Sequence, residues 1–208
     1  MYQMVGTMNE SKEHILVTSL RLFLQKNFKE VTMKQIVEET GMSKGAFYHY
    51  FSSKEQVFEE VIQHFFMDMM SIDFSKIPFH SLKQFYTEIL AESENKRKKS
   101  MKLIGGNKEL TFTANLYYLI FDAMKILPGF KETLLLYQKE EVKAWTARVK
   151  HARENGEIES EMSDAQLAKL FIYTGDGIGI SRIMEENSNK IGSELKPLWD
   201  GLYKAIKV

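Results

Sequence analysis

Apolar residues recur at three- and four-residue steps along most of the chain, the spacing that places them on one face of an α-helix. The first stripe lies between Glu10 and Lys26 and includes Ile15, Leu16 and Leu20. Later stripes predict long helices over residues 82–103, 109–127, 130–154, 163–187 and 194–206. Breakers rich in glycine and asparagine separate these helices, and the three prolines are expected between helices or at their edges. The pattern predicts an all-α protein.

Between residues 32 and 70 the pattern is divided into shorter helices by residues that cap helix ends. Serine and threonine are favoured just before a helix, because their side-chain oxygen accepts a hydrogen bond from a free backbone N–H of the first turn. Capped helices are expected at 33–40, 44–50 and 54–70, after Thr32, Ser43 and Ser53. Gly41 follows the first of them in the position that usually needs a left-handed backbone.

Two short helices joined by a tight glycine-containing turn form a helix-turn-helix, whose second helix lies in the major groove of DNA. Here the turn is Gly41 to Ser43, and the second helix carries an unbroken aromatic row from Phe47 to Phe51. At about 100° per residue, Phe47 and Phe51 share one face, which we expect to pack into a small core. Gly45, Tyr48 and His49 fall on the opposite face and are expected to point outward.

The charge of this region is balanced rather than strongly basic. The whole chain has 28 basic and 28 acidic side chains, so no global field favours nucleic acid or a membrane surface. Residues 40–54 contain Lys44, His49 and Lys54 and no carboxylate, whereas residues 1–60 as a whole carry one more acidic than basic side chain. A DNA contact must therefore come from that local patch and from the helix N-termini, where backbone N–H groups can meet phosphates.

Residues 31–62 resemble the DNA-binding signature of the TetR family of bacterial transcriptional regulators. The matching positions are Thr32, Ile36, Gly41, Ser43, Gly45, Phe47, Tyr48, Tyr50, Phe51 and Lys54. The resemblance implies about nine helices, of which the first three read DNA and the rest bind a small molecule and dimerise. It divides the chain into a helix-turn-helix domain at 1–53 and a body at 54–208, connected by the helix over 54–70.

The same resemblance implies which side chains meet DNA. Those expected to face mostly its backbone are Thr32, Lys34, Ser43, Lys44, Tyr48, Tyr50 and Lys54, while Gly45, Ala46 and His49 lie nearest the base edges. Ala46 is smaller than the residue often found there, so it offers only an apolar contact, such as one to a thymine methyl. Tyr50 lies between the two faces of its helix and could instead serve the core. Because backbone contacts carry little sequence information, the operator cannot be deduced.

The body is rich in aromatic residues and methionine, which form the core of a helical bundle or line a small-molecule pocket between its helices. The pocket candidates that follow from the resemblance are Phe85, Tyr117, Phe121, Tyr137 and Trp145. Few charged residues interrupt the segment 110–127, which favours an apolar or aromatic inducer.

The last two long helices are expected to form the dimer interface. The residues expected in it are Gly175, Gly179, Leu195, Leu198 and Leu202. Interior glycine costs helix stability, and close packing between helices is a common reason to keep it. Tight packing within one subunit is the alternative explanation for the glycines.

The function expected from the sequence is that of a ligand-responsive regulator, most simply a repressor, which binds a near-palindromic operator as a homodimer and is released by an inducer. The alternative is a helical module that binds small molecules or proteins and has little specific affinity for DNA. An enzyme is not expected, because no nucleophile elbow, phosphate loop or HExxH motif is present. No cofactor, metal or membrane partner is expected, and the absence of cysteine, of a signal-like N-terminus and of long apolar runs indicates the cytoplasm.

Overall fold

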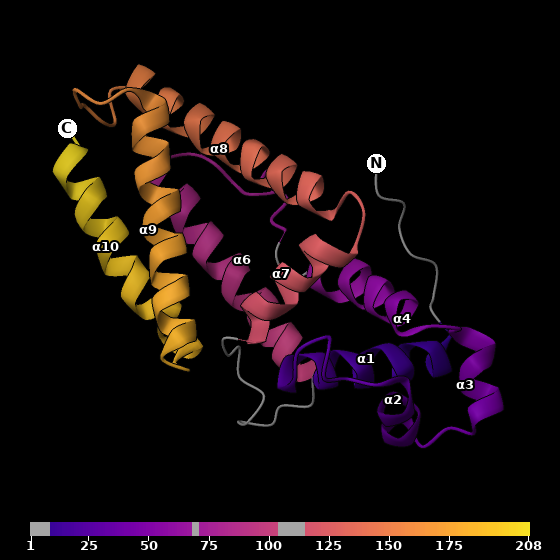
Figure 1. Ribbon diagram of the computed structural model, residues 1–208. Helices are drawn as coiled ribbons and strands as arrows, with labels where there is room; N and C mark the ends of the chain where they lie inside the picture. Colours follow the sequence, from indigo (N-terminus) through magenta and orange to yellow (C-terminus); the bar gives the residue numbers. More distant parts are fainter. Residues whose placement is uncertain (1–8, 68–70, 104–114) are drawn as a thin grey trace. The chain divides into compact units, whose positions relative to one another are not determined.

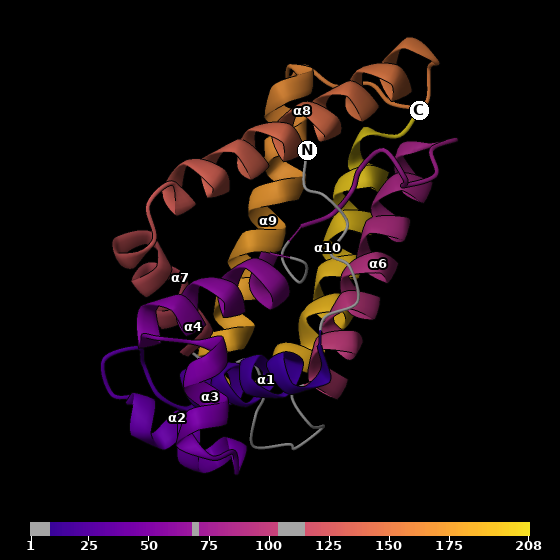
Figure 2. The same ribbon diagram turned by 90° about the vertical axis from the view of Figure 1, so that its right-hand side faces the viewer.

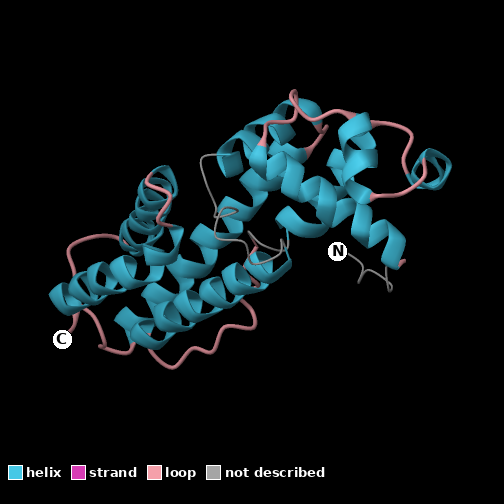
Figure 3. Cartoon of the chain, turned by 90° about the horizontal axis from the view of Figure 1, so that it is seen from below, coloured by secondary structure: helices cyan, strands magenta, loops and turns pink. Residues whose placement is uncertain are grey.

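The computed structural model describes residues 9–67, 71–103 and 115–208, and its regular structure is helical, as Figure 3 shows. The described residues contain nine α-helices, and their only β-type pairing is an isolated antiparallel bridge between Ile158 and Lys207. The predicted all-α class is therefore confirmed. No helix in the described part of the chain is long and apolar enough to cross a membrane.

The helices group into two compact units, each with its own core (Figures 1 and 2). The first unit consists of residues 1–70 and 100–128. Its described helices are α1 (Glu10–Gln25), α2 (Met33–Thr40), α3 (Lys44–Tyr50), α4 (Lys54–Val61), the π-helical turn η1 (Ile62–Phe66) and α7 (Asn115–Ile126). Helix α7 thus packs against α1, although the two helices lie far apart in the sequence.

The core of the first unit is aromatic. Phe23, Phe28 and Phe58 bring together α1, the loop after it and α4, with ring centroids 4.8 to 6.0 Å apart. Phe47 and Phe51 are completely buried in the same unit, as the helical wheel predicted. Burial of each such side chain contributes roughly 1.5–3 kcal/mol to folding. The face of α3 that carries Phe47 therefore attaches the helix to the core.

The second unit consists of residues 71–99 and 129–208. Its helices are α6 (Leu82–Leu103), α8 (Phe130–Glu154), α9 (Asp164–Met184), the 3₁₀ turn η3 (Ser188–Lys190) and α10 (Ile191–Ile206). Only the part of α6 up to residue 99 belongs to this unit. Trp145 of α8 lies at the centre, stacked on Phe171 at 5.2 Å and edge-on to Phe85 and Trp199 at 5.0 and 5.3 Å. Helices α9 and α10 lie side by side in Figures 1 and 2, and the indole N–H of Trp199 donates to the backbone oxygen of Phe171 between them.

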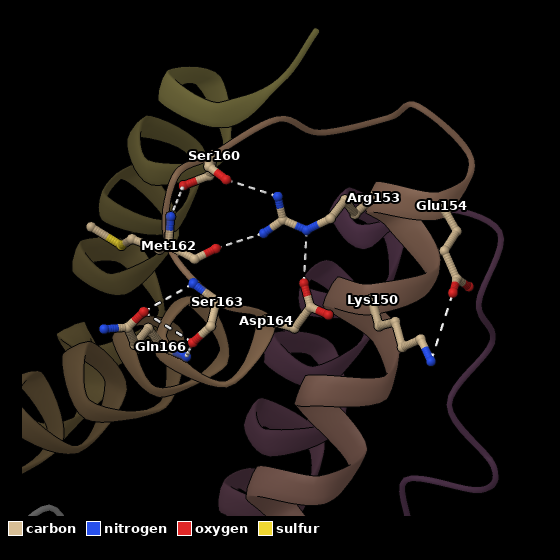
Figure 4. Close-up of polar contacts among 8 residues, drawn as sticks. All are labelled: Lys150, Arg153, Glu154, Ser160, Met162, Ser163, Asp164 and Gln166. Carbon is tan, nitrogen blue, oxygen red and sulfur yellow. Dashed lines mark hydrogen bonds and ion pairs between the residues drawn. The ribbon is translucent and has the colours of Figure 1, made fainter.

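A single guanidinium organises the connection between α8 and α9 (Figure 4). Arg153 donates from Nε to the carboxylate of Asp164 at 2.8 Å, and from its other nitrogens to the backbone oxygens of Ser160 and Met162 at 2.8 and 2.7 Å. Ser163 and Gln166 form a capping box at the start of α9. These bonds fix α8 and α9 as an antiparallel pair.

The observed helix ends follow the predicted caps closely, with two corrections. Pro197 was expected at a helix edge, but α10 begins at Ile191, so the proline lies inside the helix. Without an N–H, Pro197 cannot donate to the carbonyl of Ser193, and its exposed position lets water reach that oxygen instead. The predicted helix over 54–70 changes at Ile62 into the π-helical turn η1, which periodicity alone did not indicate. Residues 68–70 and the predicted helical residues 109–114 lie outside the described residues.

The predicted division into domains at residues 53 and 54 remains a prediction. By packing, α4 belongs with the three helices before it, and α7 joins the same unit.

Candidate nucleic-acid interface

The turn between α2 and α3 is built from local hydrogen bonds and one glycine. The Thr32 hydroxyl oxygen accepts a hydrogen bond from the backbone N–H of Gln35, and the Gln35 side-chain oxygen accepts one from the backbone N–H of Thr32, so α2 begins with a capping box. Gly41 has a φ of +65°, a left-handed backbone that favours glycine. His14 of α1 holds the last turn of α2 through a 2.9 Å bond between its Nε2 and the backbone oxygen of Thr40. The direction in which α3 leaves this turn is thereby fixed.

Helix α3 has a buried face and an open face. Ser43 caps it by accepting from the N–H of Ala46, and Phe47 anchors it in the core. Tyr48 is 50% exposed and His49 is also exposed, so both point away from the core as predicted. A Cβ at Gly45 would meet nothing within 4 Å. The glycine therefore makes no close contact inside the protein, and the space beside it is open to a partner.

Most of the predicted DNA contacts lie on exposed surface of the first unit. Those that are exposed are Thr32, Lys34, Ser43, Lys44, Gly45, Ala46, Tyr48 and His49. Lys44 has no ion-pair partner among the described residues, whereas Lys34 faces Glu38 at 3.7 Å on the same helix. That pair is largely exposed, so its strength is small and a phosphate could displace the carboxylate.

Tyr50 is half-buried, with its ring 5.3 Å from that of His49. A DNA contact and a core role both stay predictions for Tyr50.

Lys54 has a structural environment that the sequence did not predict. Its ammonium donates to the backbone oxygens of Phe28 and Val31 at 2.7 and 2.8 Å, and it lies 4.1 Å from the centre of the Phe28 ring. Two of its three N–H groups are therefore used inside the protein. One N–H of the ammonium is left for any contact outside the protein.

The predicted pocket residues are distributed over both units. Phe85 and Trp145 contact one another in the core of the second unit, where Tyr137 lies on the more exposed N-terminal half of α8. Tyr117 and Phe121 belong to α7 of the first unit, and Phe121 is 54% exposed. Their common role in a pocket remains a prediction.

The predicted dimer residues also differ in their surroundings. Gly175 packs within its own subunit, because a Cβ there would lie 3.4 Å from Trp199 and 3.5 Å from Leu195. Leu195 is buried and Leu202 is partly buried against the same core. Leu198 is 49% exposed and Gly179 has open space beside it, so these two remain available to a partner.

Two groups of residues were not singled out from the sequence. An exposed apolar stripe runs along α9 through Leu170, Tyr173, Ile180 and Met184. Their spacing of three, seven and four residues is that of one helix face, so the sequence contained a signal for this stripe. Asp122 of α7 accepts a hydrogen bond from the backbone N–H of Phe28, and no sequence pattern links residues 94 positions apart.

An acidic pair lies in the second unit. Burial, and after it the nearby Asp176 carboxylate, raises the pKa of Glu141 to about 7. Burial likewise raises the pKa of Asp176, although much of that residue is open to solvent. Neither carboxylate has a hydrogen-bond partner in the described part of the chain. No group of three or more histidine, aspartate or glutamate side chains able to hold a metal occurs among the described residues.

Comparison with known proteins identifies a family match in the first unit. Residues 15–61 match the family model described as bacterial regulatory proteins, tetR family, and these residues contain the capped turn and α3. These residues are therefore a DNA-binding segment of the TetR type. The resemblance noted from the aromatic row and the glycines is thereby confirmed.

TetR relatives with curated descriptions match over the same short segment. The HTH-type transcriptional regulator YerO of Bacillus subtilis is 56% identical over 48 residues, which are 23% of this chain and 17% of YerO. The HTH-type transcriptional repressor NemR of Escherichia coli is 39% identical over 49 residues, or 24% of this chain and 25% of NemR. The match thus spans about a quarter or less of each relative. These relatives are described as regulators rather than enzymes, in agreement with the expectation from the sequence.

Solved TetR structures share the fold over nearly the whole chain. A transcriptional regulator of the TetR family from Agrobacterium tumefaciens has a TM-score of 0.62 at 11% identity, covering 95% of this chain and 98% of that one. The reduced form of Escherichia coli NemR has a TM-score of 0.57 at 15% identity, with 93% and 98% covered. At such identities the likeness concerns the fold alone.

Proposed function

We propose that this TetR protein is a ligand-responsive transcriptional regulator of the cytoplasm, most simply a repressor. It binds a near-palindromic operator as a homodimer and releases it when a small molecule occupies the helical body. The observation that carries the proposal is the open face of α3, where Lys44, Tyr48 and His49 are exposed while Phe47 anchors the helix from behind.

The proposed DNA contacts divide into two groups. The first group binds phosphates: Lys34 and Lys44 do so by charge, and Thr32, Ser43 and Tyr48 by hydroxyl groups or helix N-termini. Gly45, Ala46 and His49 lie closest to the bases, and His49 can donate to or accept from a base edge. The glycine supports this placement, since a side chain there would occupy the open space that the DNA needs.

The apolar stripe of α9, together with exposed Leu198 of α10, supports the proposed homodimer. Tyr173 is 59% and Met184 70% exposed, more than a lone soluble subunit needs to leave in water. A two-fold symmetric dimer has two α3 helices, one for each half-site of a near-palindromic operator. Compared with the sequence-based expectation, the proposed interface keeps Gly179 and Leu198 and replaces Gly175, Leu195 and Leu202 with the exposed residues of α9.

Sedimentation tests the dimer. Tyr173→Glu, which places a charge in the stripe, is expected to convert the dimer to a monomer at micromolar concentration. The matched control is Met162→Glu, because Met162 is also an exposed apolar residue but lies in the loop before α9. If Tyr173→Glu sediments as the unmodified protein does, the interface lies elsewhere.

The aromatic cluster of the second unit supports a ligand with an apolar or aromatic body. Trp145 is almost completely buried, and its indole N–H has no acceptor among the described residues. An unpaired buried donor costs about 1–3 kcal/mol, which a ligand with a hydrogen-bond acceptor could recover. A thermal-shift screen that compares aromatic ligands with and without an acceptor tests this part of the proposal. A ligand that stabilises the protein and lowers its DNA affinity is expected.

Selection of bound sequences from a random DNA duplex pool tests the regulator proposal most directly. Recovery of a near-palindrome would support DNA binding and two-fold symmetry together. Recovery of no sequence above background, with the protein folded and dimeric, would contradict specific DNA recognition.

A second candidate function is a helical module that binds small molecules or proteins without specific DNA binding. The balanced charge of residues 1–60 and the Lys34–Glu38 pair favour it. The two candidates differ in the salt dependence of DNA binding: each phosphate contact contributes a slope of about −0.9 to log K against log salt concentration, and a module without such contacts has no slope.

A further inference from the structure

The loop between α1 and α2 is held from both sides by side chains that lie far away in the sequence. From one side, the Lys54 ammonium binds the backbone oxygens of Phe28 and Val31 at 2.7 and 2.8 Å. From the other, the Asp122 carboxylate accepts the backbone N–H of Phe28 at 3.2 Å. The C=O and N–H of one residue are thus bound by a cation from α4 and an anion from α7.

The residues around this loop strengthen the arrangement. The Phe28 ring is buried between Phe23 and Phe58, so the loop is anchored by its side chain as well as its backbone. Asn115, at the start of α7, donates to the backbone oxygens of Leu24 and Gln25, the last carbonyls of α1. Hydrogen bonds to charged groups are about twice as strong as neutral ones, so Lys54 and Asp122 are the dominant polar restraints.

The position of the loop determines where α2 begins. Val31 directly precedes Thr32, the N-cap of α2, and α2 leads through Gly41 into α3. Lys54 is the first residue of α4, so its bonds tie the start of α4 to the start of α2. Thr32, at the start of α2, belongs to the surface proposed to meet phosphates.

We propose that Lys54 and Asp122 are positioning residues for DNA binding. They clamp the loop of residues 26–31 and so set the placement of α2 and α3, and neither side chain contacts DNA. This inference rests on the proposed function for its use of DNA, but the clamp itself can be measured in the free protein. It assigns Lys54 an internal task in place of the phosphate contact that its position in the sequence motif implied.

The variants separate a clamp from a charge effect. Lys54→Met removes the ammonium and keeps the aliphatic stem over the Phe28 ring. Lys29→Met is the matched control, because Lys29 is an exposed lysine of the same loop with no hydrogen bond or ion pair among the described residues. Asp122→Ala removes the other half of the clamp, and by charge alone the loss of a carboxylate would raise DNA affinity.

The first measurement is amide hydrogen exchange of the free protein, normalised to the core amides of α1. Exchange of the Phe28 amide is expected to accelerate by about tenfold or more in Lys54→Met and in Asp122→Ala, and to stay unchanged in Lys29→Met. Unchanged Phe28 exchange in both clamp variants would overturn the clamp, whatever the protein does with DNA.

The second measurement is DNA affinity as a function of salt, with the selected duplex or, failing its recovery, a random-sequence pool. Lys54→Met and Asp122→Ala are each expected to lower affinity about tenfold at fixed salt without changing the salt slope. Lys44→Ala is expected to reduce the magnitude of the slope by about 2 for the dimer, from two lost phosphate contacts. A similar slope change in Lys54→Met would show that Lys54 is a phosphate contact, and unchanged affinity in both clamp variants would overturn the positioning role.

The outcomes keep this inference separate from the proposed function. If the unmodified protein shows no salt-dependent DNA binding, the proposed function fails while hydrogen exchange still decides whether the clamp exists. If Lys54→Met does not fold, Asp122→Ala and Lys54→Arg carry the test, since arginine retains the charge and can donate to both carbonyls. Lys54→Arg is expected to restore most of the affinity lost in Lys54→Met.

Discussion

Helix α3 and the antiparallel pair of α8 and α9 differ in how much of their surface is buried. Helix α3 has seven residues, is buried through Phe47 on one face and leaves polar and aromatic side chains in water on the other. Helices α8 and α9 have 25 and 21 residues and bury Trp145 and Phe171 between them. In α3 an exposed side chain is a candidate for function, whereas in the pair the functional candidates lie among side chains that also hold the core.

Substitution in the core of the pair should have the largest effect on stability. Trp145→Ala removes a fully buried ring that contacts three other aromatic rings, and is expected to lower the free energy of unfolding by about 3–5 kcal/mol. Chemical denaturation measures the loss, and Phe121→Ala, at a mostly exposed position of α7, is the control expected to change it little. A loss below about 1 kcal/mol at Trp145 would indicate that its surroundings are not tightly packed.

A smaller effect, which depends on pH, should appear in the same pair of helices. The pKa of Glu141 is about 7 in the folded protein and close to 4.5 when unfolded, so the unfolded chain loses its proton first. The stability contribution of the neutral carboxyl is therefore present below about pH 4.5 and is lost as pH rises towards 7. Glu141→Gln is expected to remove this slope and to stabilise the protein at pH 8 by at most about 3 kcal/mol.

Denaturation of both proteins from pH 5 to pH 8 measures the difference. Equal stability of Glu141→Gln and the unmodified protein at pH 8 would mean that the carboxyl is solvated in the fold. Glu140→Gln, at the neighbouring exposed position, is the matched control and is expected to have no such effect.

On α3, by contrast, substitution should affect binding and leave stability intact. Lys44→Ala combined with Tyr48→Ala removes two exposed side chains, and is expected to lower DNA affinity about a hundredfold or more at fixed salt. The free energy of unfolding should change by no more than about 0.5 kcal/mol. Mobility shift and denaturation, measured on the same sample, check both; unchanged DNA affinity would mean that α3 does not face DNA.

The smallest effect compares two helix caps. Ser43 caps α3 and Ser163 caps α9, each by accepting a hydrogen bond from a backbone N–H of the first turn. Ser43→Ala and Ser163→Ala are each expected to cost about 1 kcal/mol of stability. Only Ser43→Ala is expected to lower DNA affinity, and equal losses of affinity in both variants would show that Ser43 acts through stability alone.

The sequence predicted the helix-turn-helix in detail because its determinants are local. Thr32, Ser43 and Ser53 each cap the helix expected of them, Gly41 has the left-handed backbone that its position required, and Phe47 is buried. Each of these outcomes depends on residues no more than a few positions apart, which is the range over which a pattern can be recognised without a structure.

The remaining features depend on contacts between distant segments. The Lys54 bonds reach carbonyls 23 and 26 residues away, and Asp122 reaches across 94, so nothing in the motif distinguishes an internal lysine from one that meets a phosphate. Gly175 indicated close packing, and the side chain beside it is Trp199 of the next helix, a neighbour that no local pattern identifies. Pro197 was placed at a helix edge because an exposed proline inside a helix leaves no mark on the apolar pattern.

The hydrogen bonds from α7 to the loop after α1 also have a consequence during synthesis of the chain. The helix-turn-helix motif is complete once residue 61 has left the ribosome, but Asp122 and Asn115 follow more than fifty residues later. A nascent or truncated chain that ends before α7 therefore has every side chain proposed to touch DNA and lacks half of what fixes their position. We expect affinity for DNA to mature only when α7 has been made and has docked, which would delay DNA binding until the chain extends well beyond the helix-turn-helix motif.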